Sequence, residues 1–169
     1  MAQALFLGQD AVIGSVTFEL VPGIDYPPLA GQVKVTIRLN NLADGEHGIH
    51  IHGDVPGPLP GADCERAGAH FCIGPSWSAT SPGGIAHGSW ALGTTRHTGD
   101  LCNNVVSRDG LALFEYVDDL ISLHPSSPAY IVGRTVVVHA GADDGGLGPS
   151  AQSKISGNAG ARVACAVIR

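Results

Sequence analysis

The sequence contains no apolar run near the roughly 18 residues that a membrane-spanning helix needs. Basic residues are also scarce, because nine Lys and Arg stand against fifteen Asp and Glu and leave a net charge of −6. A general nucleic-acid binder normally carries a basic surface, so this balance argues against that class of protein. Charged residues make up only 14% of the chain and hydrophobic residues 44%, which excludes a disordered chain as well.

The first ten residues, MAQALFLGQD, lack the Lys or Arg that opens a secretory signal, and their apolar run ends at Leu7. We therefore expect residues 1–10 to form a first strand and the protein to be cytoplasmic. The four cysteines do not decide the compartment, because they suit free thiols as well as two disulfides.

A chain of 169 residues has the size of one compact domain, here 1–169. Its 24 Gly and 11 Pro leave little room for long helices. Short stretches rich in Val, Ile and Thr predict strands at 11–20, 32–39, 48–52, 111–116, 135–139 and 162–168. Two Gly-rich stretches, 52–101 and 140–160, lack this pattern and are long enough to be functional loops. The sequence predicts an all-β sandwich or Greek-key barrel with two long loops.

The placement of the histidines suggests metal sites. The two-residue period of a strand puts His50 and His52 on one face, as half of a metal site or as an exposed polar pair. The long stretch that follows holds a set suited to a closed tetrahedral zinc site, unless it is a flexible loop that happens to contain histidine: His70, His87, His97 and Asp100. His139 ends an apolar strand, where a histidine is often a satisfied edge residue. His47 and His124 have no partner pattern and are expected at the surface.

Five segments, in this order, resemble the copper/zinc superoxide dismutase family: GIHIH at 48–52, AGAHF at 67–71, RHTGDL at 96–101, GRTVVVH at 133–139 and GNAGARVAC at 157–165. The resemblance runs from about 12 to 168. It implies an eight-stranded Greek-key β-barrel with an immunoglobulin-like sandwich arrangement. It also implies an enzyme that converts superoxide into oxygen and hydrogen peroxide at a redox-cycling copper ion next to a structural zinc ion.

The resemblance assigns two ligand sets that share one residue. The implied copper ligands are His50, His52, His70 and His139, and the implied zinc ligands are His70, His87, His97 and Asp100. His70 would bridge both ions. Asp143 would link a copper ligand, His52 or His50, to His87. Arg162 would dock the substrate anion beside copper. In the second long loop only Lys154 remains as a guide for the anion, so we expect weaker electrostatic steering than is usual in the family.

The cysteines divide into two pairs. The resemblance implies a disulfide between Cys64 and Cys165. Cys72 and Cys102 have no counterpart in the family pattern, and each follows an implied zinc ligand by two residues. We expect these two cysteines to form a second disulfide, with two small buried thiols as the rival interpretation.

The remaining expectations concern partners and alternatives. A homodimer is expected, with an altered interface, because residues 53–61 form a longer, Pro-rich stretch and the sequence stops before the family's usual end. A copper chaperone is a further candidate partner. The main alternative function is a non-enzymatic copper- and zinc-binding domain of the same fold. A second alternative is a zinc-only hydrolytic or hydratase site made of His50, His52 and His139.

Overall fold

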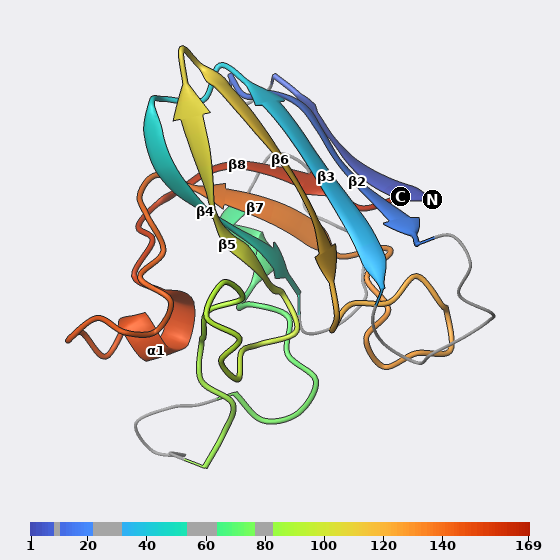
Figure 1. Ribbon diagram of the computed structural model, residues 1–169, viewed down its shortest axis with the longest axis vertical. Helices are drawn as coiled ribbons and strands as arrows, with labels where there is room; N and C mark the ends of the chain where they lie inside the picture. The colour runs from blue at the N-terminus through green and yellow to red at the C-terminus, as the bar shows by residue number, and fades with distance from the viewer. Residues whose placement is uncertain (9–10, 22–31, 54–63, 77–82) are drawn as a thin grey trace.

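The computed structural model describes residues 1–8, 11–21, 32–53, 64–76 and 83–169. These residues fold into eight β-strands with almost no helix (Figure 1). The strands are β1 (Ala2–Leu7), β2 (Ile13–Leu20), β3 (Val33–Asn40), β4 (Gly45–His52), β5 (Asp100–Arg108), β6 (Leu111–Asp118), β7 (Thr135–His139) and β8 (Arg162–Val167). The helical elements are the 3-10 turn η1 (Cys64–Ala67) and the single-turn helix α1 (Ser153–Ser156). No described helix is long and apolar enough to cross a membrane.

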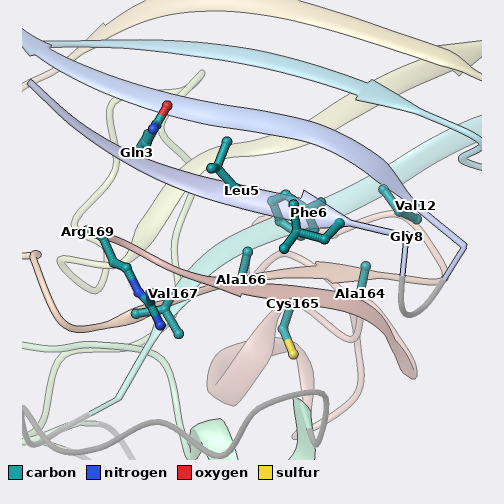
Figure 2. A pocket seen from close by; sticks show the side chains of 11 residues that line it. Gln3, Leu5, Phe6, Gly8, Val12, Ala164, Cys165, Ala166, Val167 and Arg169 are labelled. Atoms are coloured by element: carbon teal, nitrogen blue, oxygen red, sulfur yellow. The ribbon is translucent and has the colours of Figure 1, made fainter.

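The strands pair antiparallel in the order β1-β2-β3-β6-β5-β4-β7-β8. Because β3 pairs with β6 and β4 with β7, the chain crosses over twice, as in a Greek key. The first and last strands meet through a bridge between Ala4 and Ile168. Two backbone hydrogen bonds of 2.8 Å between Gln3 and Arg169, both labelled in Figure 2, reinforce this closure. The sheet is a nearly closed barrel, so the predicted all-β Greek-key fold is confirmed.

Alternating side chains explain why these segments form strands around one core. In β3, Val33, Val35, Ile37 and Leu39 are fully buried, while the residues between them are half-buried or exposed. In β4, Ile49 and Ile51 point into the same core. His50 and His52, on the opposite face of β4, are also fully buried. A strand that is buried on both faces must be covered on its outer side, and here the long loops cover it.

Strand β5 is the element that the sequence pattern did not predict. Its sequence, DLCNNVVSR, does not alternate cleanly, and its pairing with β4 shifts register between Ile49 and His50. Asn103 adopts a left-handed backbone conformation, with φ of 66°, at this irregularity. A bulge of this kind interrupts the two-residue period on which strand prediction depends. The predicted strand at 48–52 also proved too short, since β4 begins at Gly45.

The described residues 83–99 and 140–160 of the two long loops lie on the same side of the barrel, at the lower left in the view of Figure 1. They contact each other directly, because the backbone N–H of His87 donates to the carbonyl oxygen of Lys154 at 2.9 Å. Gly146 fits against the carbonyl of His87 with a φ of 77°, and any Cβ atom there would collide with that carbonyl. The close approach of the two loops therefore depends on a residue without a side chain.

Candidate metal centre

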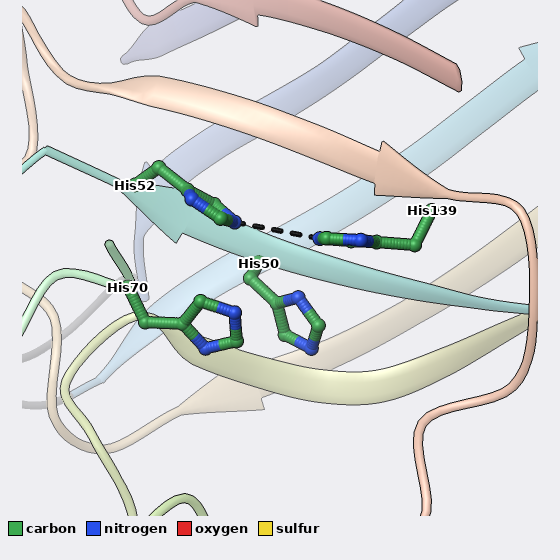
Figure 3. A group of neighbouring side chains, drawn as sticks. All are labelled: His50, His52, His70 and His139. Atoms are coloured by element: carbon green, nitrogen blue, oxygen red, sulfur yellow. Dashed lines mark hydrogen bonds between the residues drawn. The ribbon is translucent and has the colours of Figure 1, made fainter. Parts of the chain in front are cut away.

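Strand β4 supplies the first two histidines of the site. His50 and His52 project from the face of β4 that lies opposite the core residues Ile49 and Ile51, as the strand period predicts. The next strand, β7, pairs with β4 and ends at His139. His70 is brought to the same place by an isolated antiparallel bridge between His52 and His70. Segments far apart in the sequence thus bring four buried imidazoles together (Figure 3).

These four histidines form a compact group in which each offers one ring nitrogen. The possible ligand atoms of His50, His52, His70 and His139 all lie within 4.8 Å of one another. The Nδ1 atoms of His52 and His139 donate to backbone carbonyls, at 2.9 Å to Gly68 and 3.1 Å to Gly160. Their Nε2 atoms then present lone pairs to each other at 3.4 Å, the contact drawn in Figure 3. Buried lone pairs that face each other in this way fit a shared cation.

Two further buried nitrogens support this interpretation. Among the described residues, His50 Nδ1 and His70 Nε2 have no hydrogen-bond partner, although each belongs to a fully or almost fully buried ring. Burial of a polar atom without a partner costs free energy, so an atom left in this state needs an explanation. A metal ion bound by the four inward nitrogens would satisfy both atoms. Four imidazoles are a donor set well suited to copper.

A second group lies around the carboxylate of Asp100. The Nδ1 atoms of His70, His87 and His97 lie 2.7, 3.0 and 3.3 Å from its Oδ1 atom. All four side chains are buried, and their possible ligand atoms lie within 4.8 Å of one another. Three imidazoles and one carboxylate match a four-coordinate zinc site with no open position. His70 contributes Nδ1 to this group and Nε2 to the other, so one ring belongs to both.

Asp143 connects the two groups. Its Oδ2 atom accepts a hydrogen bond from His50 Nε2 at 2.7 Å, and its Oδ1 atom accepts one from His87 Nε2 at 2.8 Å. The sequence resemblance left open whether His50 or His52 makes this link, and in the structure it is His50. By accepting from Nε2, the carboxylate fixes the proton there and leaves Nδ1 of each histidine available as a metal ligand.

Burial and charge shift the pKa values of the site residues in opposite directions. Burial, reinforced by the neighbouring ring of His70, lowers the pKa of His50 to about 3, and burial likewise lowers the pKa of His139 to about 4. His87 differs. Burial alone would lower its pKa, but hydrogen bonds to the carboxylates of Asp100 and Asp143 outweigh burial and raise it to about 9. Burial thus favours neutral imidazoles at His50 and His139, whereas the carboxylates of Asp100 and Asp143, whose pKa values are lowered by hydrogen bonds from histidines despite their burial, supply negative charge.

Arg162 begins β8 and pairs with His139 at the end of β7. Its half-buried guanidinium donates to three carbonyl oxygens of one segment, at 2.8 Å to Cys64, 3.3 Å to Glu65 and 2.6 Å to Gly68. These bonds fix the direction of its positive charge next to the four-histidine group. A disulfide joins Cys64, in the same segment, to Cys165 in β8, as expected.

The expected second disulfide is absent. Cys72 and Cys102 are not bonded to each other, and both remain thiols. Cys102 belongs to the hydrophobic core of the barrel, whereas Cys72 is half-buried in the loop that follows His70. Their spacing from the implied zinc ligands was therefore not a sufficient basis for pairing these two cysteines. Burial also raises the pKa of the Cys102 thiol above its ordinary value.

Two groups of residues near the site were missed or misjudged from the sequence. His47 was expected at the surface, yet it is buried, and its ring nitrogens contact the carbonyl oxygens of His139 at 2.8 Å and Ala43 at 2.7 Å. Its position in β4, on the side of the strand next to the core, would have been the only signal. Asn103 and Asn104, which bind Asp143, carried no signal, because their role depends on the bulge in β5.

The chain is similar in sequence to known proteins. The profile of the copper/zinc superoxide dismutase (SODC) family matches residues 12–168. An extracellular superoxide dismutase [Cu-Zn] of Caenorhabditis elegans is 38% identical over 160 residues, which cover 94% of this chain and 65% of the relative. A superoxide dismutase [Cu-Zn] of Paramecium bursaria Chlorella virus 1 is 37% identical over 142 residues, which cover 82% of this chain and 67% of the relative. The chain thus spans about two thirds of the length of these relatives.

The fold is also similar to that of a solved structure. The crystal structure of the clock protein EA4 superposes with a TM-score of 0.77 and 36% sequence identity, covering 99% of this chain and 92% of that chain. The names of the matched family and relatives supply copper and zinc as the ions for the two ligand groups.

The expected cytoplasmic location was wrong. One matched relative is extracellular, and the chain carries an internal disulfide of the kind that persists in oxidising compartments. The expectation rested on the first ten residues, which contribute strand β1 to the barrel. A strand at that point of the sequence gives no information about the compartment.

Proposed function

The chain belongs to the copper/zinc superoxide dismutase family, and from this membership we propose that it disproportionates superoxide at a copper ion bridged through His70 to a zinc ion. The observation that carries the proposal is the His70 ring, whose two nitrogens lie in two separate, buried ligand groups. A plain binding domain has no need for such sharing, because two independent sites would hold two ions equally well.

The donor atoms divide between the two ions. Copper would be held by His50 Nδ1 and by the Nε2 atoms of His52, His70 and His139. Zinc would be held by the Nδ1 atoms of His70, His87 and His97 and by the carboxylate of Asp100. In the reaction, two superoxide anions and two protons give one oxygen molecule and one hydrogen peroxide molecule. Copper, when bound, supplies the reversible one-electron chemistry that this exchange requires.

The residues of the chain supply orientation, charge and a proton. Arg162, held by three carbonyls, presents a fixed cationic fork suited to a small anion. His70 Nε2 is the atom that can take up a proton and deliver it to the reduced product, since Nδ1 of the same ring is committed to the zinc group. Asp143 keeps the proton of His50 on Nε2. Lys154, exposed on α1, is the proposed guide for the incoming anion.

The test is to load the protein with one copper and one zinc per chain and to follow superoxide decay by pulse radiolysis. We expect decay far above the spontaneous rate, and loss of the effect when copper is removed. His139→Ala should abolish the effect, whereas His124→Ala should not, because His124 belongs to neither ligand group. A fully loaded protein that leaves superoxide to decay spontaneously would overturn the proposal. That outcome would favour a non-enzymatic binding domain. A hydrolytic or hydratase activity with zinc alone would favour a site made of His50, His52 and His139.

We propose that 1–169 forms one domain, supported by the single core to which all eight described strands contribute. We propose a homodimer with an altered interface. The Pro-rich stretch 53–61, on which this expectation rests, lies outside the described residues except for Gly53, and sedimentation will give the mass of the assembly. We propose a copper chaperone as the partner that loads the copper site.

A further inference from the structure

Asn104 holds the backbone of Asp143 with its side-chain amide. Asn104 Nδ2 donates to the Asp143 carbonyl oxygen at 2.8 Å, and Asn104 Oδ1 accepts from the Asp143 N–H at 2.7 Å. We propose that Asn104 is a positioning residue of the metal centre, which acts through Asp143 to couple the copper and zinc sites. The inference rests on the proposed function, since it concerns the two ions assigned there.

The bulge in β5 makes this contact possible. Successive side chains of a regular strand point to opposite faces, so Asn103 and Asn104 should not reach the same residue. The left-handed conformation of Asn103, with φ of 66°, and the register shift opposite Ile49 and His50 break this alternation. Both asparagines then reach Asp143. Asparagine tolerates the left-handed region better than most residues, which favours it at position 103.

The two asparagines bind different parts of Asp143. Asn103 Nδ2 donates to the carboxylate oxygen Oδ2 at 3.1 Å and to the carbonyl of Gly88 at 2.9 Å. Asn103 is thus a direct partner of the carboxylate and of the residue that follows His87. Asn104 binds only the main chain of Asp143, in the same pattern as a neighbouring strand would. This double contact fixes the position and direction from which the Asp143 side chain leaves the backbone.

The carboxylate has little freedom once its backbone is fixed. Its Oδ2 atom accepts hydrogen bonds from His50 and Asn103. Its Oδ1 atom accepts hydrogen bonds from His87 and, at 2.7 Å, from the N–H of Gly145. His50 belongs to the four-histidine group and His87 to the group around Asp100. A small displacement of Asp143 would therefore loosen one ligand of each ion together. Asn104 thus influences both sites through Asp143. None of the hydrogen bonds described for its side chain is to a metal ligand.

The inference predicts a specific thermodynamic signature. In the wild-type protein, bound zinc should raise the affinity for copper, because each ion orders the carboxylate that the other site uses. Asn104→Leu, which keeps the approximate size and removes both hydrogen bonds, should lower the zinc affinity about tenfold, the lower end of what such outer partners cost. It should also reduce the effect of zinc on copper affinity. Asn40→Leu, at an exposed position of β3, is the matched control and should change neither quantity.

The decisive experiment is a double-mutant cycle with Asp143→Asn. Zinc and copper ions are titrated into the metal-free proteins against a competing chelator, and the electron paramagnetic resonance spectrum of bound copper is recorded with and without zinc. If Asn104 acts through Asp143, Asn104→Leu should lose affinity in the wild-type background and have little effect in the Asp143→Asn background. If Asn104→Leu does not fold, Asn104→Asp gives the same comparison, because it keeps the acceptor and loses the donor.

Each outcome separates the inference from the proposed function. Equal loss of affinity from Asn104→Leu in both backgrounds would overturn the inference, since Asn104 would then act by a route other than Asp143. Unchanged zinc affinity and an unchanged copper spectrum in Asn104→Leu would overturn it as well. Neither result would affect the proposed superoxide chemistry, which fails only if the protein loaded with both ions does not accelerate superoxide decay.

Discussion

Gly157 packs so closely against Asp143 that a Cβ atom at this position would overlap the carboxylate oxygen Oδ1. The same Cβ atom would press on His87 Nε2, the donor of the hydrogen bond to that oxygen. Gly157→Ala is therefore expected to separate Asp143 from His87. We predict a loss of zinc affinity of about 10- to 100-fold, measured by chelator competition.

The control for this substitution is Gly160→Ala. Gly157 and Gly160 have similar left-handed conformations, with φ of 66° and 80°, so both alanines carry the same backbone penalty of about 1–2 kcal/mol. At Gly160 no atom lies within 4 Å of the added Cβ. A comparable loss of zinc affinity in both variants would show that backbone strain, and not the overlap with Asp143, is responsible.

The disulfide between Cys64 and Cys165 should stabilise both the fold and the position of Arg162. It joins residues 101 apart, and chain-entropy models give about 4–5 kcal/mol for a loop of that length. Because Arg162 donates to the carbonyl of Cys64, loss of the disulfide should also loosen the guanidinium. The double variant Cys64→Ser/Cys165→Ser should lower the free energy of unfolding in urea by several kcal/mol and reduce kcat/KM for superoxide. Cys72→Ser, which leaves the disulfide intact, should do neither.

Acid should destabilise the metal-free protein well above pH 4. The pKa of His50 is lowered to about 3 and that of His139 to about 4, mainly by burial, whereas an unfolded chain has a histidine pKa near 6.5. Between these values the unfolded state binds more protons than the folded state, so stability falls as the pH is lowered from about 6.5 to about 4. Urea unfolding at several pH values will measure this.

Bound metal ions should shift this loss of stability to lower pH, because coordination keeps the imidazoles deprotonated. A metal-free protein that is equally stable at pH 7 and pH 4.5 would contradict the assignment of these histidines as neutral, buried groups.

Added salt should change kcat/KM for superoxide only slightly. The chain has a net charge of −6, and Lys154 is the proposed guide in the second loop. We predict that kcat/KM falls by less than about a factor of two between low and physiological ionic strength. Lys154→Gln should lower the low-salt rate, whereas Lys34→Gln, which removes an ion pair with Glu115 on the outer face of β3, should not. A steep salt dependence would mean that other cations guide the anion.

The sequence was sufficient where a repeating period or a compact motif carried the information. The period of β4 placed His50 and His52 opposite the core residues Ile49 and Ile51, and the structure has this arrangement. The family motifs predicted a disulfide between Cys64 and Cys165, and the structure contains it.

Features that depend on tertiary geometry were not predictable. Strand β5 was missed because its bulge at Asn103 removes the period. The same bulge explains why the contacts of Asn104 with Asp143 were not foreseen. The error at Cys102 arose because its spacing from Asp100 did not reveal that its side chain lies in the core. His47 was misjudged because its buried state depends on carbonyls from β7 and from the residues before β4, which no local pattern reveals.

The hydrogen bond from the His87 backbone to the Lys154 carbonyl joins a candidate zinc ligand to the helix that bears the proposed guiding lysine. Occupancy of the zinc group would thus also influence where the side chain of Lys154 lies. Without bound zinc, the protein would therefore capture superoxide less efficiently even with copper in place. Zinc occupancy and substrate capture would then be linked.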